Sequence, residues 1–209
     1  MTTGCRLIYI HDPMCSWCWG FRPTFEQLCA GLPRQVSVAC LLGGLAPDSD
    51  RPMPADMQMR LQQTWRQIQR RIPGTRFNFD FWQVCDPRRS TWPACRAVIA
   101  AREFDMALET AMITAIQHAY YLQARNPSDS TTLVSLAEDL GIDGMAFAHR
   151  LDAPETQATL ADEIARSRRM GADSFPSLRL QIGDSLWPVP LDYTDAGVMS
   201  ATIEALTEA

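Results

Sequence analysis

The sequence predicts an α/β protein in which the two ends of the chain build one small sheet and a block of helices is inserted between them. Three observations support this. The chain opens as strand, helix and strand, its middle is helical throughout, and it ends as two strands and a helix. We therefore assign residues 1–50 and 172–209 to one discontinuous domain, and residues 51–171 to a helical insertion domain. With 46% apolar residues, the 209-residue chain can bury a sizeable core.

The N-terminal segment predicts a βαβ unit. The stretch CRLIYIHD at residues 5–12 has strand composition, and QVSVACLLGG at residues 35–44 is typical of a buried strand that ends in glycines. Between them, residues 17–32 carry apolar side chains at helical spacing. These side chains are Phe21, Phe25, Leu28 and Leu32. Pro23 removes one backbone hydrogen bond from this helix and predicts a kink.

The middle of the chain is predicted to be a succession of helices. A long apolar stripe ends at Pro73-Gly74, and its members are Met57, Leu61, Trp65, Ile68 and Ile72. Further helical segments follow, at residues 90–104, 106–122, 130–140, 143–151 and 155–170.

The C-terminal segment returns to strand. SLRLQI at residues 177–182 alternates apolar and polar residues, Gly183-Asp184 is typical of a turn, and LWPVP follows, which together predict a hairpin. A last helix over residues 194–206 places Met199, Ile203 and Leu206 on one face.

Composition limits the classes of partner. The formal net charge of −5 gives no electrostatic reason to expect nucleic acid, and no apolar run is long enough to cross a membrane. The N-terminus has neither the basic start nor the cleavage site of a secretory leader, so we expect a cytoplasmic protein or a mature form whose leader was removed. All 19 basic residues are arginines, which excludes a mechanism that needs lysine.

Seven cysteines are present, and only Cys15 and Cys18 lie close together in the sequence. An odd number of mostly isolated cysteines argues against a disulfide framework, although a bridge between Cys85 and Cys95 stays open. A structural zinc site needs four ligands, and no second CxxC, CxxH or HxxxH motif accompanies the pair. We therefore expect no metal and no organic cofactor.

The position of the pair favours redox exchange over a structural use. Cysteines at i and i+3 of a helix start lie on one face, within bridging distance. Cys15 is expected in the first turn, where unpaired N–H groups and the helix dipole favour a thiolate. Cys15 would then attack a disulfide, and Cys18 would resolve the mixed intermediate. We expect Trp17, between the two cysteines, to be exposed to a substrate peptide. His11 and Arg22 are near in sequence, and whether His11 tunes Cys15 stays open.

The block DPMCSWCWGF, followed by a strand, a helical insertion and a proline-led hairpin, resembles the DsbA-like branch of the thioredoxin superfamily, and within it the cytoplasmic-type, FrnE-like members. The segments STWPACRA and AYYLQARNPSD resemble its helical insertion. The resemblance implies a thioredoxin-like fold with an inserted all-helical domain and thiol–disulfide oxidoreductase or isomerase activity. It also implies a cis proline facing the cysteines, which SFPSL places at Pro176 after Phe175, with Ser16, Trp17 and Phe175 contacting substrate.

Two departures from the family patterns affect the predicted chemistry. Ser16-Trp17 stands where strong periplasmic oxidants carry proline and histidine, so this pair should be less oxidising. The related kappa-class glutathione transferases and hydroxychromene carboxylate isomerases typically have a serine where this chain has Cys15.

The leading hypothesis is thus exchange with protein or small-molecule disulfides and thiols, with glutathione as a possible redox partner. A glutathione-binding transferase or isomerase is the alternative, and a redox-sensitive binding protein is a third hypothesis. The substrate, the direction of electron flow and the oligomeric state do not follow from the sequence.

Overall fold

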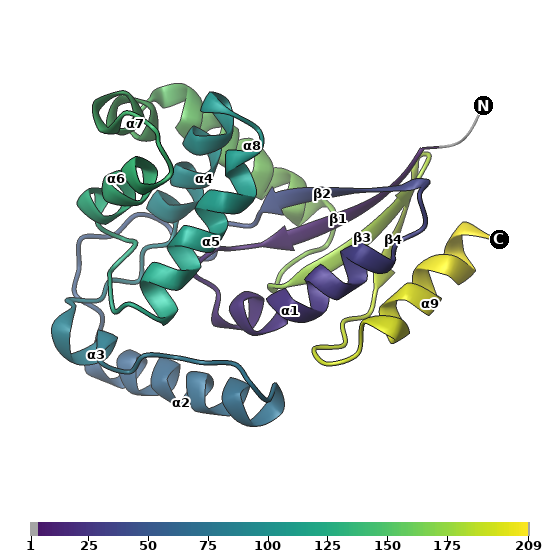
Figure 1. The fold of residues 1–209 in the computed structure, drawn as a ribbon, viewed down its shortest axis with the longest axis horizontal. Helices are drawn as coiled ribbons and strands as arrows, with labels where there is room; N and C mark the ends of the chain where they lie inside the picture. The colour runs from purple at the N-terminus through teal and green to yellow at the C-terminus, as the bar shows by residue number, and fades with distance from the viewer. Residues whose placement is uncertain (1–3, 209) are drawn as a thin grey trace.

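A computed structural model describes residues 4–208 and contains a four-stranded sheet in the order β2-β1-β3-β4 (Figure 1). Strand β1 (Cys5–His11) lies at its centre, parallel to β2 (Val36–Leu42) and antiparallel to β3 (Ser177–Ile182). A hairpin joins β3 to the edge strand β4 (Ser185–Val189). The predicted joining of the two chain ends into one sheet is therefore confirmed, as are the βαβ unit and the hairpin.

Helices α1 (Ser16–Gly31) and α9 (Ala196–Thr207) pack against one face of this sheet. Because side chains alternate along a strand, Leu7 and Tyr9 of β1 face these helices, whereas Ile8 and Ile10 face the opposite side. Helix α1 is continuous through Pro23.

The segment between β2 and β3 is a block of helices beside the sheet (Figure 1). Its members are α2 (Ala55–Arg71), α3 (Phe81–Val84), α4 (Trp92–Phe104), α5 (Leu108–Tyr121), α6 (Ser130–Asp139), α7 (Gly144–Leu151) and α8 (Pro154–Arg169). The sequence predicted all of these except the single turn α3. Helix α4 is the centre of the block, since its residues from Ala97 to Ala101 are fully buried. No helix among the described residues is long and apolar enough to span a membrane.

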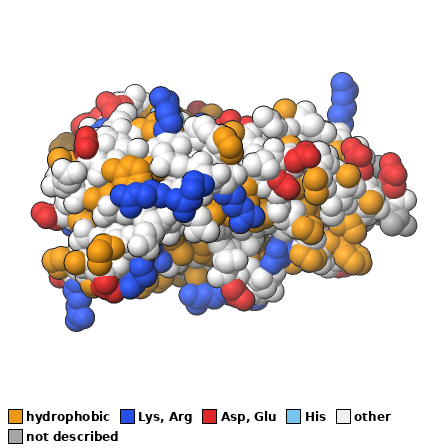
Figure 2. Space-filling model, turned by 90° about the horizontal axis from the view of Figure 1, so that it is seen from below, with side chains coloured by type: hydrophobic (Ala, Val, Ile, Leu, Met, Phe, Trp, Pro, Cys, Tyr) orange, Lys and Arg blue, Asp and Glu red, His pale blue; other side chains and the backbone are white. Residues whose placement is uncertain are grey.

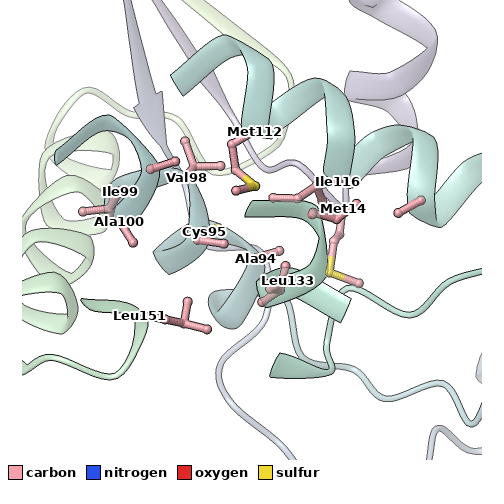
Figure 3. Packing of buried hydrophobic residues seen from close by; sticks show 14 of the residues in the cluster. Met14, Ala94, Cys95, Val98, Ile99, Ala100, Met112, Ile116, Leu133 and Leu151 are labelled. Atoms are coloured by element: carbon pink, nitrogen blue, oxygen red, sulfur yellow. The ribbon is translucent and has the colours of Figure 1, made fainter. Parts of the chain in front are cut away.

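The core of the helical block reaches the loop that precedes α1. Met14 is buried in the same cluster as Met112 and Ile116 of α5 and Val98 of α4 (Figure 3). Leu42, the last residue of β2, belongs to this cluster too. The sheet and the helical block are thus packed together at one end of the parallel strands. Their division into two domains, whose limits include the undescribed residues 1–3 and 209, stays a prediction.

Candidate redox site

The two cysteines of the CSWC motif lie at the junction between β1 and α1. Cys15 is the N-cap of α1, directly before the first turn in which it was expected, and its N–H donates to the carbonyl of Asp12 at 3.0 Å. Cys18 lies one turn further into the helix and is fully buried. Cys15 is only 6% exposed, so the start of α1 is covered at this residue. The reason is that segments distant in sequence cover this loop.

The two thiols are free, and their pKa values are shifted in opposite directions. A hydrogen bond from the Cys18 thiol, helped by the backbone N–H groups of Cys18 and Trp17, lowers the pKa of Cys15, although burial opposes this. Burial raises the pKa of Cys18 well above its ordinary value, and the neighbouring Cys15 raises it further. Cys15 is therefore the better thiolate of the pair, and Cys18 is the thiol that retains its proton.

The predicted cis proline is present, since the Phe175–Pro176 peptide bond is cis. Pro176 directly precedes β3. The backbone of this segment reaches the cysteines, since the Cys15 thiol donates a hydrogen bond to the Phe175 carbonyl over 3.4 Å. The half-buried Phe175 ring packs on the backbone of Gly43, where a Cβ atom would lie 2.0 Å from the ring. Glycine at this position is therefore required for Phe175 to approach.

The residues between the cysteines are held by helix α2 and by the segment before α9. Ser16 Oγ accepts a hydrogen bond from the Trp65 indole N–H at 2.8 Å. The ring of Trp17 lies 5.2 Å from that of Tyr193, and the Arg71 guanidinium lies 5.6 Å above Trp17. Trp17 is therefore half-buried, and the expectation that it is exposed is wrong.

Asp12 is a functional candidate that the sequence reasoning missed. Its fully buried carboxylate accepts hydrogen bonds from Met14 N at 2.8 Å, Leu45 N at 2.7 Å and Thr91 Oγ1 at 2.6 Å. Burial raises the pKa of Asp12, although these hydrogen bonds act in the opposite direction. The negative charge of Asp12 in turn raises the pKa of both Cys15 and Cys18. The sequence did place Asp12 at the end of a predicted strand and three residues before Cys15, and this position could have identified it as a site candidate.

The other cysteines do not form bridges among the described residues. The Cys95 thiol donates to Asp12 Oδ2 at 3.5 Å, and the Cys85 thiol donates to the Ala124 carbonyl at 3.0 Å. The disulfide between Cys85 and Cys95, which the sequence left open, is therefore absent. Within residues 4–208, no group of three histidine, cysteine or acidic side chains is arranged to hold a metal ion.

The structure gives His11 and Arg22 other contacts than the Cys15 sulfur. The His11 ring is 1% exposed and stacks on Tyr9 at 4.8 Å, and neither of its nitrogens has a hydrogen-bond partner in the described structure. Burial lowers the pKa of His11 to about 4, so the ring is neutral at physiological pH. Arg22 pairs with Glu26 at 2.8 Å. Among the described residues, no hydrogen bond links His11 or Arg22 to Cys15.

A groove runs along the outer side of α1, between the end of α2, helix α5 and the segment before α9. Its volume is about 680 Å³. Trp19 lines it, and the indole N–H of Trp19 donates to the Arg76 carbonyl at 3.0 Å. Tyr193 lines it as well, which connects the groove to Trp17 and hence to the cysteine pair.

The fold and the motif define a class of protein. The model of the family described as DSBA-like thioredoxin domain matches residues 7–188, and the chain belongs to this family. The predicted resemblance is thereby confirmed, together with the thioredoxin-like fold class.

Particular relatives include several disulfide oxidoreductases. A candidate protein disulfide isomerase from Nitrosomonas europaea is 25% identical, with a TM-score of 0.85 and 98% of each chain covered. The cytosolic disulfide reductase DsbM from Pseudomonas aeruginosa is 25% identical, with a TM-score of 0.77 over 97% of this chain and 98% of that one. A second DsbM structure, with GSH, is 26% identical, with a TM-score of 0.74 over 98% of this chain and 100% of that one.

A curated relative has a different assigned role. The ClpXP adapter protein SpxH of Halalkalibacterium halodurans is 23% identical over 170 residues. The match includes 79% of this chain, and the chain spans about half, 55%, of the length of that relative.

Proposed function

We propose that this protein is a thiol–disulfide oxidoreductase that exchanges a Cys15–Cys18 dithiol or disulfide with disulfide- or thiol-containing proteins or small molecules. The observation that carries the proposal is the pair of free thiols at the start of α1, with Cys15 at the N-cap beside the Phe175–Pro176 cis bond and Cys18 one turn further on. The opposite shifts of the two pKa values agree with it. Membership of the DsbA-like family and the similarity to DsbM and to the candidate isomerase support it.

In the reducing direction, the Cys15 thiolate attacks one sulfur of a substrate disulfide. The substrate S–S bond breaks, its other sulfur leaves as a thiolate that takes up a proton, and a mixed disulfide with Cys15 forms. Cys18 then loses its proton and attacks the Cys15 sulfur, which releases the second substrate thiol and leaves a Cys15–Cys18 disulfide. Two electrons pass to the substrate. The reverse sequence oxidises a substrate dithiol.

The structure gives a physical reason for the order of these two attacks. The charge of Cys15 is one of the causes that raise the pKa of Cys18. When Cys15 becomes part of a neutral mixed disulfide, that charge disappears and the pKa of Cys18 falls. Burial still raises the pKa of Cys18 at that stage, so Cys18 becomes a better nucleophile after the first step than before it.

The remaining predicted site residues have positioning roles in this proposal. Pro176 shapes the segment before β3 so that the backbone beside Phe175 pairs with substrate. Trp17 and Phe175 contact the substrate, and Ser16, bound by Trp65, fixes the first turn of α1. The reaction needs no metal or organic cofactor. We place it in the cytoplasm, because the similar protein DsbM is a cytosolic disulfide reductase.

Glutathione enters the proposal as a redox partner, because a relative has been solved with GSH. The transferase alternative makes a distinct prediction. Glutathione should bind saturably, an electrophile should be turned over, and Cys18→Ala should leave this turnover unchanged. The reduction potential of the pair, compared with that of the glutathione pool, decides whether the protein reduces or oxidises its substrates.

The direct test compares three variants in an insulin-reduction assay. Cys15→Ser should abolish turnover with the fold intact, and Cys18→Ser should accumulate a mixed disulfide through Cys15. Cys29→Ser is the matched control, since burial raises the pKa of that half-buried thiol to about 11 and it lies outside the site. Full turnover by Cys15→Ser would show that the proposed mechanism is wrong.

A further inference from the structure

We propose that an arginine-rich surface on α2 recognises acidic segments of protein substrates and delivers them to Cys15. This surface, here called the arginine face, consists of Arg66, Arg70 and Arg71 on α2 and of Arg76 just after it. All four residues are exposed. The inference rests on the proposed function, because it names the class of substrate that this redox site takes.

The arginine face is a positive region without an ion pair among the described residues of an acidic protein, although Arg71 helps to lower the pKa of Asp192. The chain has a net charge of −5, and nearby arginines are neutralised, since Arg60 pairs with Asp56 and Arg22 pairs with Glu26. None of the four residues of the arginine face takes part in an ion pair within residues 4–208. Figure 2 shows the corresponding row of basic side chains over α2, with few acidic side chains beside it.

Stabilisation of α2 itself accounts for only part of this arrangement. Arg70 and Arg71 lie in the last turn, where a positive charge interacts favourably with the helix dipole. Arg66 lies before that turn and stacks on the Phe79 ring at 5.0 Å, and Arg76 lies beyond the helix end. The dipole therefore does not explain why the positive charge continues on both sides of the last turn.

The arginine face begins at the redox motif. The Arg71 guanidinium lies 5.6 Å from the centre of the Trp17 ring and 5.0 Å from that of Tyr193. Trp17 separates the two cysteines in sequence, and Arg76 lines the groove along α1. A chain that contacts Arg71 therefore lies beside the CSWC motif.

The extent of the face favours a polypeptide over a small thiol. Arg66 and Arg71 are five positions apart, which corresponds to about 7.5 Å along a helix, and the charge continues to Arg76. An extended peptide rises about 3.3 Å per residue, so the part from Arg66 to Arg71 matches about two residues of a bound chain, and Arg76 lengthens the charged surface beyond it. Carboxylates on that chain provide the complementary charge, and guanidinium groups bind them with paired N–H donors.

The expected effect is moderate and depends on salt. Exposed ion pairs contribute little individually, so we expect two lost arginines to reduce the preference for an acidic peptide about three- to tenfold at low ionic strength. The Debye length falls from about 10 Å at 0.1 M salt to about 3 Å at 1 M, and the preference should disappear over that range.

The experiment uses two disulfide-bonded peptides that differ only in their flanking residues, which are glutamate in one and glutamine in the other. We measure kcat/KM for both with the wild-type protein, with the double variant R66Q/R70Q and with the control R6Q/R34Q. The control removes two exposed arginines outside the arginine face. The wild type and the control should prefer the glutamate peptide, and R66Q/R70Q should show this preference reduced about three- to tenfold.

Three outcomes would overturn the inference. The first is equal kcat/KM for both peptides in the wild type at low salt. The second is an unchanged preference in R66Q/R70Q. The third is a loss of activity toward glutathione disulfide in R66Q/R70Q that is as large as the loss toward the glutamate peptide. That result would mean that any small anion is recognised.

A binding measurement separates failure of docking from failure of the chemistry. Fluorescence anisotropy with the alkylated peptides and the Cys15→Ser variant reports docking without turnover. If neither disulfide peptide is turned over but the glutamate peptide binds more tightly than the glutamine peptide, the proposed function fails and the acidic preference stands. Equal binding of the two alkylated peptides would refute the arginine face.

Discussion

Replacing Asp12 by asparagine should destabilise the fold and make Cys15 more acidic. The carboxylate accepts three hydrogen bonds of 2.8 Å or less, from Met14 N, Leu45 N and Thr91 Oγ1. The last two reach the same oxygen, Oδ2. If the asparagine oxygen faces Met14, its NH₂ group faces the Leu45 N–H, and two donors are brought together.

The magnitude follows from these contacts. A hydrogen bond to a charged group contributes about 1.5–3 kcal/mol, and the one from Leu45 is lost. Thr91 can rotate its hydroxyl to accept from the new amide. A neutral amide is easier to bury than a carboxylate, as the raised pKa of Asp12 indicates, which offsets part of the loss. We expect a net cost of about 1–2 kcal/mol in the free energy of unfolding.

Urea unfolding of the reduced protein measures this cost, and thiolate absorbance as a function of pH measures the pKa of Cys15. That pKa should fall, because the carboxylate of Asp12 is one of the groups that raise it. Asp143→Asn is the matched control: Asp143 is an exposed N-cap that accepts from Ala146 N at 2.8 Å, and asparagine caps a helix equally well. If Asp12→Asn unfolds like the control and leaves the Cys15 pKa unchanged, the reasoning is refuted.

Two further predictions concern buried charge. Because the pKa of His11 is lowered to about 4 from its ordinary 6.5, the unfolded chain binds a proton first as the pH falls. Stability should therefore decrease by about 3 kcal/mol between pH 6.5 and 4, and His11→Phe should remove this dependence from pH-resolved urea titrations. The buried Glu163 accepts from the Leu42 N–H at 2.8 Å and pairs with Arg102. Glu163→Gln should lower the unfolding free energy by about 2 kcal/mol, because a charged hydrogen bond to Arg102 is lost while Arg102 keeps its ion pair with Glu109 at 3.0 Å, and an unchanged urea midpoint would contradict this.

The regular elements were predictable because each depends on a short stretch of sequence. The stripe that ends at Ile72 defines a helix by its own periodicity, and the alternation in residues 177–182 defines a strand. The cis bond before Pro176 was predictable from the family resemblance. The four-residue helix α3 was missed, because one turn is too short to establish a helical period.

The surroundings of the cysteines were not predictable in the same way. The Asp12 carboxylate accepts hydrogen bonds from Leu45 and Thr91, which lie 33 and 79 residues further along the chain. Trp17 is half-buried because Arg71 and Tyr193 meet over it. No local pattern in CSWC encodes these contacts, since each depends on how separate segments pack in the finished fold.

The helical block therefore does more than add surface beside the thioredoxin-like sheet. It surrounds the loop before α1, because Met14 is buried in its core and Thr91, at the start of α4, binds Asp12. On α2, Trp65 binds Ser16 between the two sulfurs. Burial is the largest cause of the raised pKa of Cys18, and it opposes the lowered pKa of Cys15. If the block were loosened from this loop, more water would reach Cys18 and its pKa would fall. The high pKa of Cys18 is thus a property of the packed helical block as well as of the CSWC motif.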